Sequence, residues 1–361
     1  MIGPAARGPS PAGSSRRFFP RRLWFACALL SLSFAAHGAR ADRPGQGMDH
    51  LENVRRILFL GDSITYDGQY IEDIEAYFTT RFPARPFEFL NLGLPSETVS
   101  GLSEPGHAGG KFPRPDLHER LARVLQKTRS DLVIACYGMN DGIYEPFSED
   151  RFRRFQQGIL WLHEQVTASG AAIIHVTPPV FDAAAANARK KADGKEPSDL
   201  PFAGYNAVLD RYSEWLLGRR AAGWSVVDLH GPMNRWLAEH RAADPSFSYT
   251  RDGVHPDAAG HWWIARQILA YLGAKDGAAA GSLAEMLLDQ PHGEEILHLI
   301  QQKQRMLKDA WLTDTGHKRP GMKRGLPIAE AEARSAVLDQ EIARLARRHP
   351  ASLLPAAKAQ W

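Results

Sequence analysis

The fold of this 361-residue chain is decided by the segment Arg56-Ile57-Leu58-Phe59-Leu60-Gly61-Asp62-Ser63-Ile64-Thr65. Its first half is a continuous apolar run, which is typical of a strand covered on both faces in a parallel sheet. Its second half is a turn sequence that carries a serine. In open α/β sheets, functional residues lie beyond the carboxyl ends of the strands. We therefore expect Ser63 at the edge of the sheet where a site would form.

Four further apolar runs follow this segment and alternate with longer amphipathic stretches. Such alternation is typical of β-α units, and it predicts a three-layer α/β/α sandwich around a parallel five-stranded sheet. The predicted strands are Arg56–Leu60, Phe87–Leu92, Leu132–Tyr137, Ala171–Val176 and Trp224–Leu229.

Two regions lie outside this alternation. Residues 181–205 are polar and rich in Ala, Lys, Gly and Pro, which predicts an exposed excursion that either borders a substrate cleft or is a plain solvated loop. After Gly273, two helical patterns, Glu294–Leu312 and Ile328–Arg347, predict a C-terminal helical hairpin over residues 282–350. Its apolar stripes need a partner surface. Three alternatives fit: the α/β domain, a second copy of the chain, or another protein.

Residues 1–41 have the features of a signal peptide. A basic stretch, Arg16–Arg22, precedes an apolar run, Leu23–Ala36, and Ala39-Arg40-Ala41 forms a cleavage site of small residues. The general secretory route and the twin-arginine route fit equally well, and an uncleaved anchor is the alternative. We expect an exported protein that is periplasmic or extracellular.

The basic character of the chain resides in this segment. Residues 1–41 hold six arginines and no acidic residue, so cleavage after Ala41 changes the formal net charge from +3 to −3. The remaining charges are scattered and of mixed sign, whereas nucleic-acid binding needs a clustered basic surface. No segment is long and apolar enough to persist as a membrane span. We therefore exclude nucleic-acid binding, and stable membrane insertion of the mature chain.

The chain has two cysteines, Cys27 in the predicted signal peptide and Cys136 in a predicted strand. The mature protein therefore cannot form an internal disulfide, and Cys136 is interpreted as a small core residue. No Cys/His cluster has the spacing of a metal site. We predict no structural metal.

A second candidate segment is Asp252-Gly253-Val254-His255-Pro256, which precedes a helical pattern beginning near Asp257. Pro256 disfavours helical geometry at His255. Asp252 and His255 therefore share one tight loop, where the carboxylate can accept a hydrogen bond from the imidazole and leave the other ring nitrogen as a base. Alone, this segment and Gly61-Asp62-Ser63 are equally well explained as turns and helix caps. Their combination indicates nucleophilic catalysis.

Two more loops follow the second and third predicted strands. They are Asn91-Leu92-Gly93 and Gly138-Met139-Asn140-Asp141. Acyl transfer builds negative charge on a carbonyl oxygen, and fixed N–H donors stabilise that charge. The Gly93 N–H and the Asn140 amide are candidate donors.

In order and context, these four blocks resemble those of the SGNH/GDSL hydrolases. The resemblance spans about Arg56 to Gly273, within a predicted hydrolase domain over residues 50–273, and leaves the helical hairpin outside. It implies a flavodoxin-like sheet order, 2-1-3-4-5, and an enzyme without a metal or cofactor. The sequence after the first strand lacks a Gly-x-Ser-x-Gly elbow, which disfavours the larger α/β-hydrolase fold. The roles that the resemblance implies are the nucleophile for Ser63, the orienting acid for Asp252, the general base for His255, and the oxyanion hole for the N–H groups of Ser63 and Gly93 and the amide of Asn140.

The resemblance implies an exported serine esterase that hydrolyses small acyl esters through an acyl-serine intermediate. Acetyl groups on carbohydrate are the expected substrates. A lipase, lysophospholipase or thioesterase is the alternative within the fold, and an inactive glycan- or partner-binding module is the alternative from another class. The presence of Ser63, Asp252 and His255 together favours an enzyme.

Five other polar residues lie in the same loops. Glu97 and His107 either line the cleft or belong to a mobile loop. Tyr144 and Glu145 either contact substrate or pack within their own loop. Asp141 is expected to brace its loop.

Overall fold

The computed structural model describes residues 51–194 and 202–347, so the predicted signal peptide lies outside the described residues. Five parallel strands form one sheet in the order β2-β1-β3-β4-β5, as the resemblance implied. The strands are β1 Arg56–Gly61, β2 Glu88–Asn91, β3 Leu132–Cys136, β4 Ala172–Val176 and β5 Ser225–Val227. Each predicted strand is confirmed to within two residues at either end.

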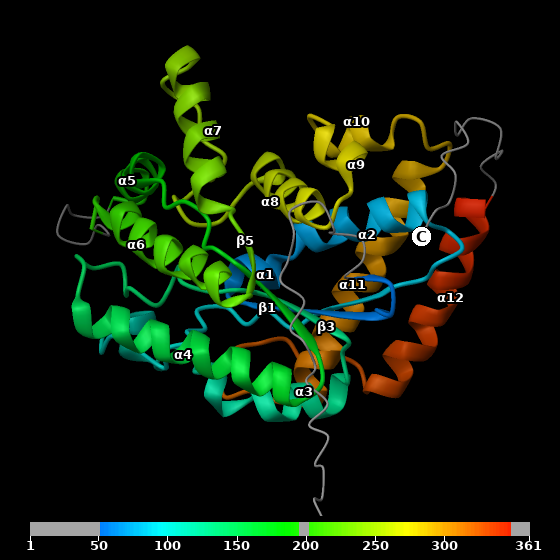
Figure 1. The fold of residues 1–361 in the computed structure, drawn as a ribbon, viewed down its shortest axis with the longest axis horizontal. Helices are drawn as coiled ribbons and strands as arrows, with labels where there is room; N and C mark the ends of the chain where they lie inside the picture. Colours follow the sequence, from blue (N-terminus) through cyan, green and yellow to red (C-terminus); the bar gives the residue numbers. More distant parts are fainter. Residues whose placement is uncertain (1–50, 195–201, 348–361) are drawn as a thin grey trace, which may run out of the picture. The chain divides into compact units, whose positions relative to one another are not determined.

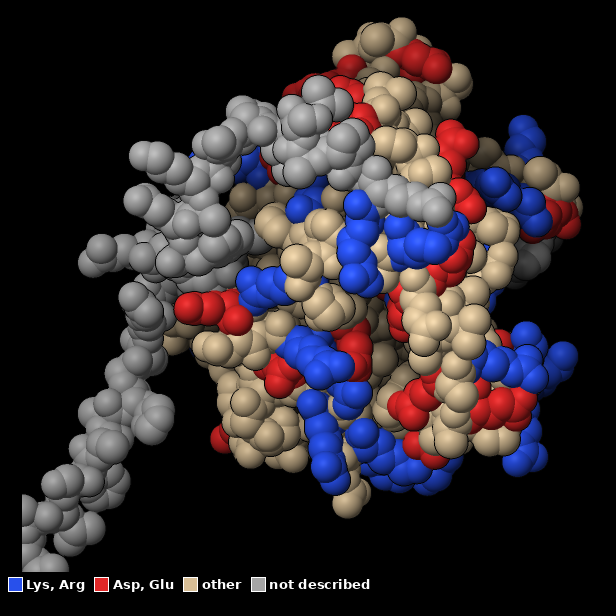
Figure 2. Space-filling view, turned by 90° about the vertical axis from the view of Figure 1, so that its right-hand side faces the viewer, with Lys and Arg blue, Asp and Glu red and all other residues tan. Residues whose placement is uncertain are grey.

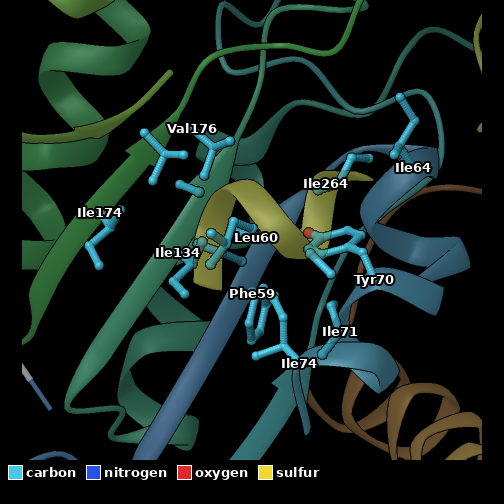
Figure 3. Close-up of a cluster of buried hydrophobic side chains, with 14 of the residues drawn as sticks. Phe59, Leu60, Ile64, Tyr70, Ile71, Ile74, Ile134, Ile174, Val176 and Ile264 are labelled. Carbon is cyan, nitrogen blue, oxygen red and sulfur yellow. The ribbon is translucent and has the colours of Figure 1, made fainter. Parts of the chain in front are cut away.

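Helices cover both faces of the sheet, which explains why its strands are apolar without alternation. Helices α2 (Gln69–Arg81) and α8 (Ala258–Tyr271) pack together on one face, and α3 (Leu121–Thr128) and α4 (Glu149–Ala168) lie on the other (Figure 1). Side chains from β1, β3, β4, α2 and α8 meet in the core shown in Figure 3. The fold class is therefore the predicted three-layer α/β/α sandwich.

The remaining helices are shorter or lie in the connections. One of them falls in residues 181–205, where the sequence predicts an exposed excursion. This prediction is wrong for Phe181 and Asp182, which are buried, whereas α5, which begins directly after them, buries only Ala186. Asp182 caps the helix by accepting hydrogen bonds from the N–H groups of Ala184 and Ala185. Besides α2, α3, α4 and α8, the α-helices that precede the C-terminal hairpin are α1 Ser63–Asp67, α5 Ala183–Ala192, α6 Tyr205–Gly218, α7 His230–Ala243, α9 Lys275–Ala279 and α10 Leu283–Leu287.

The predicted C-terminal hairpin is present, and its partner is the α/β domain. Its helices are α11 (Gly293–Thr315) and α12 (Ile328–Arg347), and α11 packs on α2 and on the edge strand β2. The Gln304 amide nitrogen donates to the Glu75 carboxylate at 2.6 Å and to the Phe89 carbonyl at 2.9 Å. The hairpin therefore covers a sheet edge that would otherwise expose unpaired backbone groups.

An ion network centred on the buried Lys303 joins α2, α11 and α12, and its member on α12, Asp339, is about half exposed. The Lys303 ammonium lies 2.5 Å from a Glu75 oxygen and 2.6 Å from an Asp339 oxygen. Burial alone would lower the pKa of Lys303, but the two carboxylates raise it above its usual range. Burial raises the pKa of Glu75 despite this partner. The charge on Lys303 thus compensates a carboxylate that is 2% exposed.

A cavity of about 480 Å³ lies between the β2 edge and α12. Phe82, Phe87 and Trp311 are among its lining residues, and none of the candidate site residues is. Figure 2 views the molecule from the right-hand side of Figure 1, where α12 lies, and shows basic and acidic side chains intermixed on that face. Among the helices of the described residues, none is long and apolar enough to span a membrane.

We expect Lys303→Met to lower the free energy of unfolding by about 3–5 kcal/mol, because it leaves the Glu75 carboxylate buried without its cation. The measurement is urea denaturation at neutral pH. Lys323→Met is the matched control, since Lys323 is 80% exposed and its pair with Asp309 is long, at 3.3 Å. We expect the control to cost less than about 1 kcal/mol. Equal losses in the two variants would contradict a structural role for the buried network.

Candidate active site

Ser63 stands at the junction between β1 and α1, at the carboxyl edge of the sheet. The Asp62 carboxylate caps α1 by accepting the Ile64 N–H at 3.0 Å. Gly61 is required at this junction, because a Cβ there would lie 2.2 Å from the Thr65 hydroxyl and 2.7 Å from the Cys136 carbonyl. This tight turn places the Ser63 hydroxyl beyond the strand, where the sequence predicts it.

Asp252 and His255 share one loop that leads into α8. One Asp252 oxygen accepts the N–H groups of Val254 at 3.0 Å and His255 at 2.8 Å. The loop needs Gly253, which has a φ of 85° and whose Cβ would lie 2.5 Å from the Asp182 carbonyl. The spacing of three residues therefore lets the carboxylate fold back onto the imidazole.

The structure brings Ser63, His255 and Asp252 together in one hydrogen-bonded chain. The second Asp252 oxygen lies 2.6 Å from His255 Nδ1, and His255 Nε2 lies 2.8 Å from the Ser63 hydroxyl oxygen. When Nδ1 carries the proton that bonds Asp252, Nε2 is the acceptor for the serine proton. Two residues separated from Ser63 by about 190 positions thus complete an arrangement suited to activating a hydroxyl.

The pKa values of His255 and Asp252 follow from these same hydrogen bonds. The hydrogen bond that His255 donates to the Asp252 carboxylate is the main cause that raises the pKa of His255 above its usual value. Burial alone would raise the pKa of Asp252, but the hydrogen bonds from His255 hold it well below its usual range. The side chains of His255 and Asp252 are 46% and 39% exposed. The proton-transfer side of the site is therefore open to solvent.

Asn140 is buried, in the loop after β3. Its amide nitrogen is 3.2 Å from an Asp62 oxygen and 3.3 Å from the Glu97 carbonyl oxygen. Its amide oxygen accepts a hydrogen bond of 2.9 Å from the Arg114 guanidinium. Burial raises the pKa of Asp62 to about 6. The structure thus places the Asn140 amide beside the residue that caps the serine helix.

Gly93 differs from its prediction as an oxyanion donor. Its N–H donates to the Asn91 side-chain oxygen at 3.0 Å, and Asn91 in turn donates to the Thr65 carbonyl at 2.7 Å. A Cβ at Gly93 would lie 2.3 Å from the Tyr66 nitrogen. Glycine is therefore needed here for close packing against α1, and its N–H is used within an Asx turn. The structure does not support Gly93 as a donor to substrate.

The backbone group that contacts Asn140 is the carbonyl of Glu97, which directly follows Ser96. Ser96 has a φ of 67°, which is unfavourable for a residue with a side chain, and the next carbonyl, that of Glu97, meets the Asn140 amide. Strained backbone of this kind gathers at functional sites. Ser96 could not be predicted from the sequence, because a serine carries no signal for positive φ.

Glu97 neither lines the cleft nor belongs to a mobile loop. It is fully buried, and its carboxylate receives two hydrogen bonds from Arg120, at 2.6 and 2.7 Å, and one from the Tyr137 hydroxyl at 2.7 Å. The role expected for Asp141 is confirmed, since its carboxylate accepts the Ser100 N–H at 2.9 Å. Both carboxylates therefore hold loops in place.

Of the other three residues, His107, Tyr144 and Glu145, one contacts a candidate site residue. His107 lies 3.5 Å from Glu104. The Tyr144 hydroxyl donates to the Asn140 amide oxygen at 3.2 Å, and its ring stacks on Tyr205. Glu145 forms an ion pair with Arg151 at 2.8 Å, away from Asn140. Tyr144 is thus the one of the three that contacts a candidate site residue.

The C-terminal hairpin also reaches the loops around Ser63. The Lys308 ammonium donates to the Tyr66 carbonyl on α1 at 2.6 Å and lies over the Tyr66 ring. The Arg319 guanidinium, in the segment between α11 and α12, donates to the Pro95 carbonyl at 2.9 Å. The hairpin therefore supports both the serine helix and the loop that precedes Ser96.

Over residues 51–194 and 202–347, no group of three or more His, Cys, Asp or Glu side chains is arranged to hold a metal ion. Cys136 is a free thiol, and burial raises its pKa well above its usual value. It is therefore in its neutral thiol form at neutral pH.

Comparison with known proteins identifies the fold and the family. The structure resembles a gut microbial diltiazem-metabolizing enzyme at 16% identity, with a TM-score of 0.58 and coverage of 86% of this chain and 97% of that one. An acetylxylan esterase from Geobacillus stearothermophilus, solved as a catalytic mutant, gives 19% identity, a TM-score of 0.44 and coverage of 61% and 94%. A putative acylhydrolase from Bacteroides fragilis gives 18% identity, a TM-score of 0.39 and coverage of 66% and 98%. No curated protein matches the chain.

The sequence family that matches is the GDSL-like lipase/acylhydrolase family, over residues 59–263. This span is more than half of the chain, and it contains every residue of the hydrogen-bonded chain described above. The protein therefore belongs to the GDSL-like lipase/acylhydrolase family and is an SGNH-type serine hydrolase.

Proposed function

We propose that the protein is an exported esterase that removes small acyl groups, chiefly acetyl groups, from carbohydrate. Ser63 is the nucleophile, His255 the general base and Asp252 the residue that orients the base. The hydrogen-bonded chain from Ser63 through His255 to Asp252 is the observation that carries this proposal. Export rests on residues 1–41, which lie outside the described residues.

The proposed reaction begins when His255 Nε2 removes the Ser63 proton and the serine oxygen attacks the ester carbonyl. Asp252 stabilises the imidazolium that forms and keeps the proton on Nδ1. His255 then gives the proton to the leaving alcohol. Water activated by His255 cleaves the acyl-serine, which releases the acid and restores the free hydroxyl.

Negative charge on the carbonyl oxygen needs donors on the buried side of Ser63. We assign the Ser63 N–H and the Asn140 amide to this role and no longer include Gly93. The Asn140 nitrogen lies 3.2 Å from an Asp62 oxygen and 3.3 Å from the Glu97 carbonyl oxygen. Hydrogen bonds of this length are weak, so a developing oxyanion can compete with these two acceptors for the amide N–H groups. The third donor that we assign is the Ser96 N–H, because Ser96 directly precedes the carbonyl that contacts Asn140 and the Glu97 N–H already donates to the Leu94 carbonyl at 3.1 Å.

The open side of the site supports a bulky alcohol part of the substrate. Almost half of the His255 side chain is exposed, so a sugar attached to the scissile oxygen can extend into solvent. Asn140 is buried, and the proposal places the short acyl group beside it. This arrangement supports an acetylated carbohydrate over a long-chain lipid.

We expect Ser63→Ala to lower kcat on p-nitrophenyl acetate by about a thousandfold or more, because the variant cannot form the acyl-enzyme. The measurement compares acetate, butyrate and octanoate esters, together with acetylated xylan. Ser246→Ala is the control, since Ser246 is an exposed serine outside the site. Equal rates in wild type and Ser63→Ala would sink the nucleophile assignment, and a preference for octanoate would shift the substrate to lipids.

The pH profile of kcat/KM tests the role of His255. Only the neutral imidazole is a base, so activity should be lost as the pH falls through the His255 pKa. Because Asp252 raises that pKa, we expect the acid limb to have its midpoint above the ordinary histidine value of about 6.5.

Asp252→Asn should shift this acid limb to lower pH and reduce kcat about 10²–10⁴-fold, because the charge that raises the pKa and orients Nδ1–H is removed. The control is Asp244→Asn, which changes an exposed carboxylate that bonds only its own turn. An acid limb at the same pH in wild type and Asp252→Asn would show that another group controls activity.

A further inference from the structure

Arg114 is a buried cation that contacts the Asn140 amide. Only 8% of the residue is exposed, although arginine is rarely buried to this extent. One end of its guanidinium forms a two-point ion pair with Glu104, with both N–O distances at 2.7 Å. The remaining nitrogen, Nη1, donates to the Asn140 amide oxygen at 2.9 Å. The side chain thus links an acidic residue in the loop after β2 to the loop after β3.

These contacts decide which way the Asn140 amide faces. Arginine has donors and no acceptor, so only the amide oxygen can face Arg114. The Tyr144 hydroxyl bonds the same oxygen at 3.2 Å, which gives that oxygen two donors. The amide nitrogen must then face the opposite way, toward Asp62 and the Glu97 carbonyl. The amide nitrogen therefore faces Asp62, the residue that precedes Ser63.

We propose that Arg114 is a positioning residue for the oxyanion site, which holds the Asn140 amide so that its N–H groups face the ester carbonyl attacked by Ser63. The proposal rests on the proposed function of Ser63 and Asn140. It adds a residue that does not touch the substrate and acts through Asn140 alone.

The charge on Arg114 contributes in addition to its geometry. A cation bonded to an amide oxygen draws electron density from the amide and makes its N–H a stronger donor. The contact is buried, so water screens it weakly. The Glu104 carboxylate offsets the cost of burying the Arg114 guanidinium, and their two hydrogen bonds fix the plane of the guanidinium group. The guanidinium carbon of Arg114 lies over the Tyr144 ring, 5.5 Å from the ring centre.

A double-mutant cycle tests whether Arg114 acts through Asn140. The variants are Arg114→Met, Asn140→Ala and their combination, with kcat and KM measured on p-nitrophenyl acetate. We expect Asn140→Ala to lower kcat about 10²–10³-fold, as loss of one oxyanion donor does. Arg114→Met should lower kcat about 10–100-fold with less than about a threefold change in KM, because the ground state makes little use of the oxyanion donor.

The combined variant gives the decisive comparison. In the Asn140→Ala background, Arg114→Met should reduce kcat by less than about threefold, because the amide that it positions is already gone. If Arg114→Met costs the same factor in both backgrounds, Arg114 does not act through Asn140 and the inference is overturned. If Asn140→Ala retains full kcat while Ser63→Ala is inactive, the oxyanion assignment fails and the nucleophile assignment stands.

Two further variants separate positioning from folding. Arg81→Met removes another largely buried arginine that pairs with two carboxylates, at 3.0 and 3.1 Å, far from Asn140 in the fold. It should lower the melting temperature without changing kcat. Tyr144→Phe removes a single hydroxyl and should preserve folding where Arg114→Met does not. It should lower kcat about 3–10-fold in the wild-type background and leave the Asn140→Ala variant unchanged; equal effects in both backgrounds would overturn the inference.

Discussion

The buried ion pair between Glu97 and Arg120 is the interaction on which the geometry of the site depends. Neither side chain is exposed, and Arg120 also donates to the Leu92 carbonyl at the end of β2. The Tyr137 hydroxyl bonds the same carboxylate from the end of β3. One pair therefore joins the loops after β2 and β3, the two strands on either side of β1, and the Glu97 carbonyl extends this link to Asn140. Removing either charge would leave the other buried and unpaired, which is costly enough to keep both loops in a single arrangement.

This constraint divides the site into a fixed, dry side and an open, wet side. Asn140 and Asp62 are buried on the dry side, where burial raises the pKa of Asp62 to about 6. His255 and Asp252 lie on the wet side, where water and leaving alcohols can exchange. The division matches the two tasks of acyl transfer. Donors to a developing charge are strongest where water is excluded, whereas proton transfer to water requires access to solvent.

Much of this arrangement could be predicted from the sequence, because it depends on local patterns. The strands follow from continuous apolar runs, and the contact between Asp252 and His255 follows from a spacing of three residues before a helix. The bond from the Gly93 N–H to Asn91 could not be predicted, because an Asx turn and an oxyanion loop look alike in sequence. Arg114 could not be found in this way, since its partner Asn140 is 26 residues away and depends on how two loops meet across the sheet edge.

The C-terminal hairpin shows the same dependence on distant contacts. Its helices could be predicted from their periodicity, but its partner surface could not, because the sequence allows three alternatives. The buried polar groups on α11 decide between them, because Lys303 and Gln304 find their partners on α2 and β2. From that position Lys308 reaches the serine helix, and Arg319 reaches the loop before Ser96. An element that covers a sheet edge thus also limits the movement of two segments of the active site, which links the stability of the hairpin to the precision of the catalytic geometry.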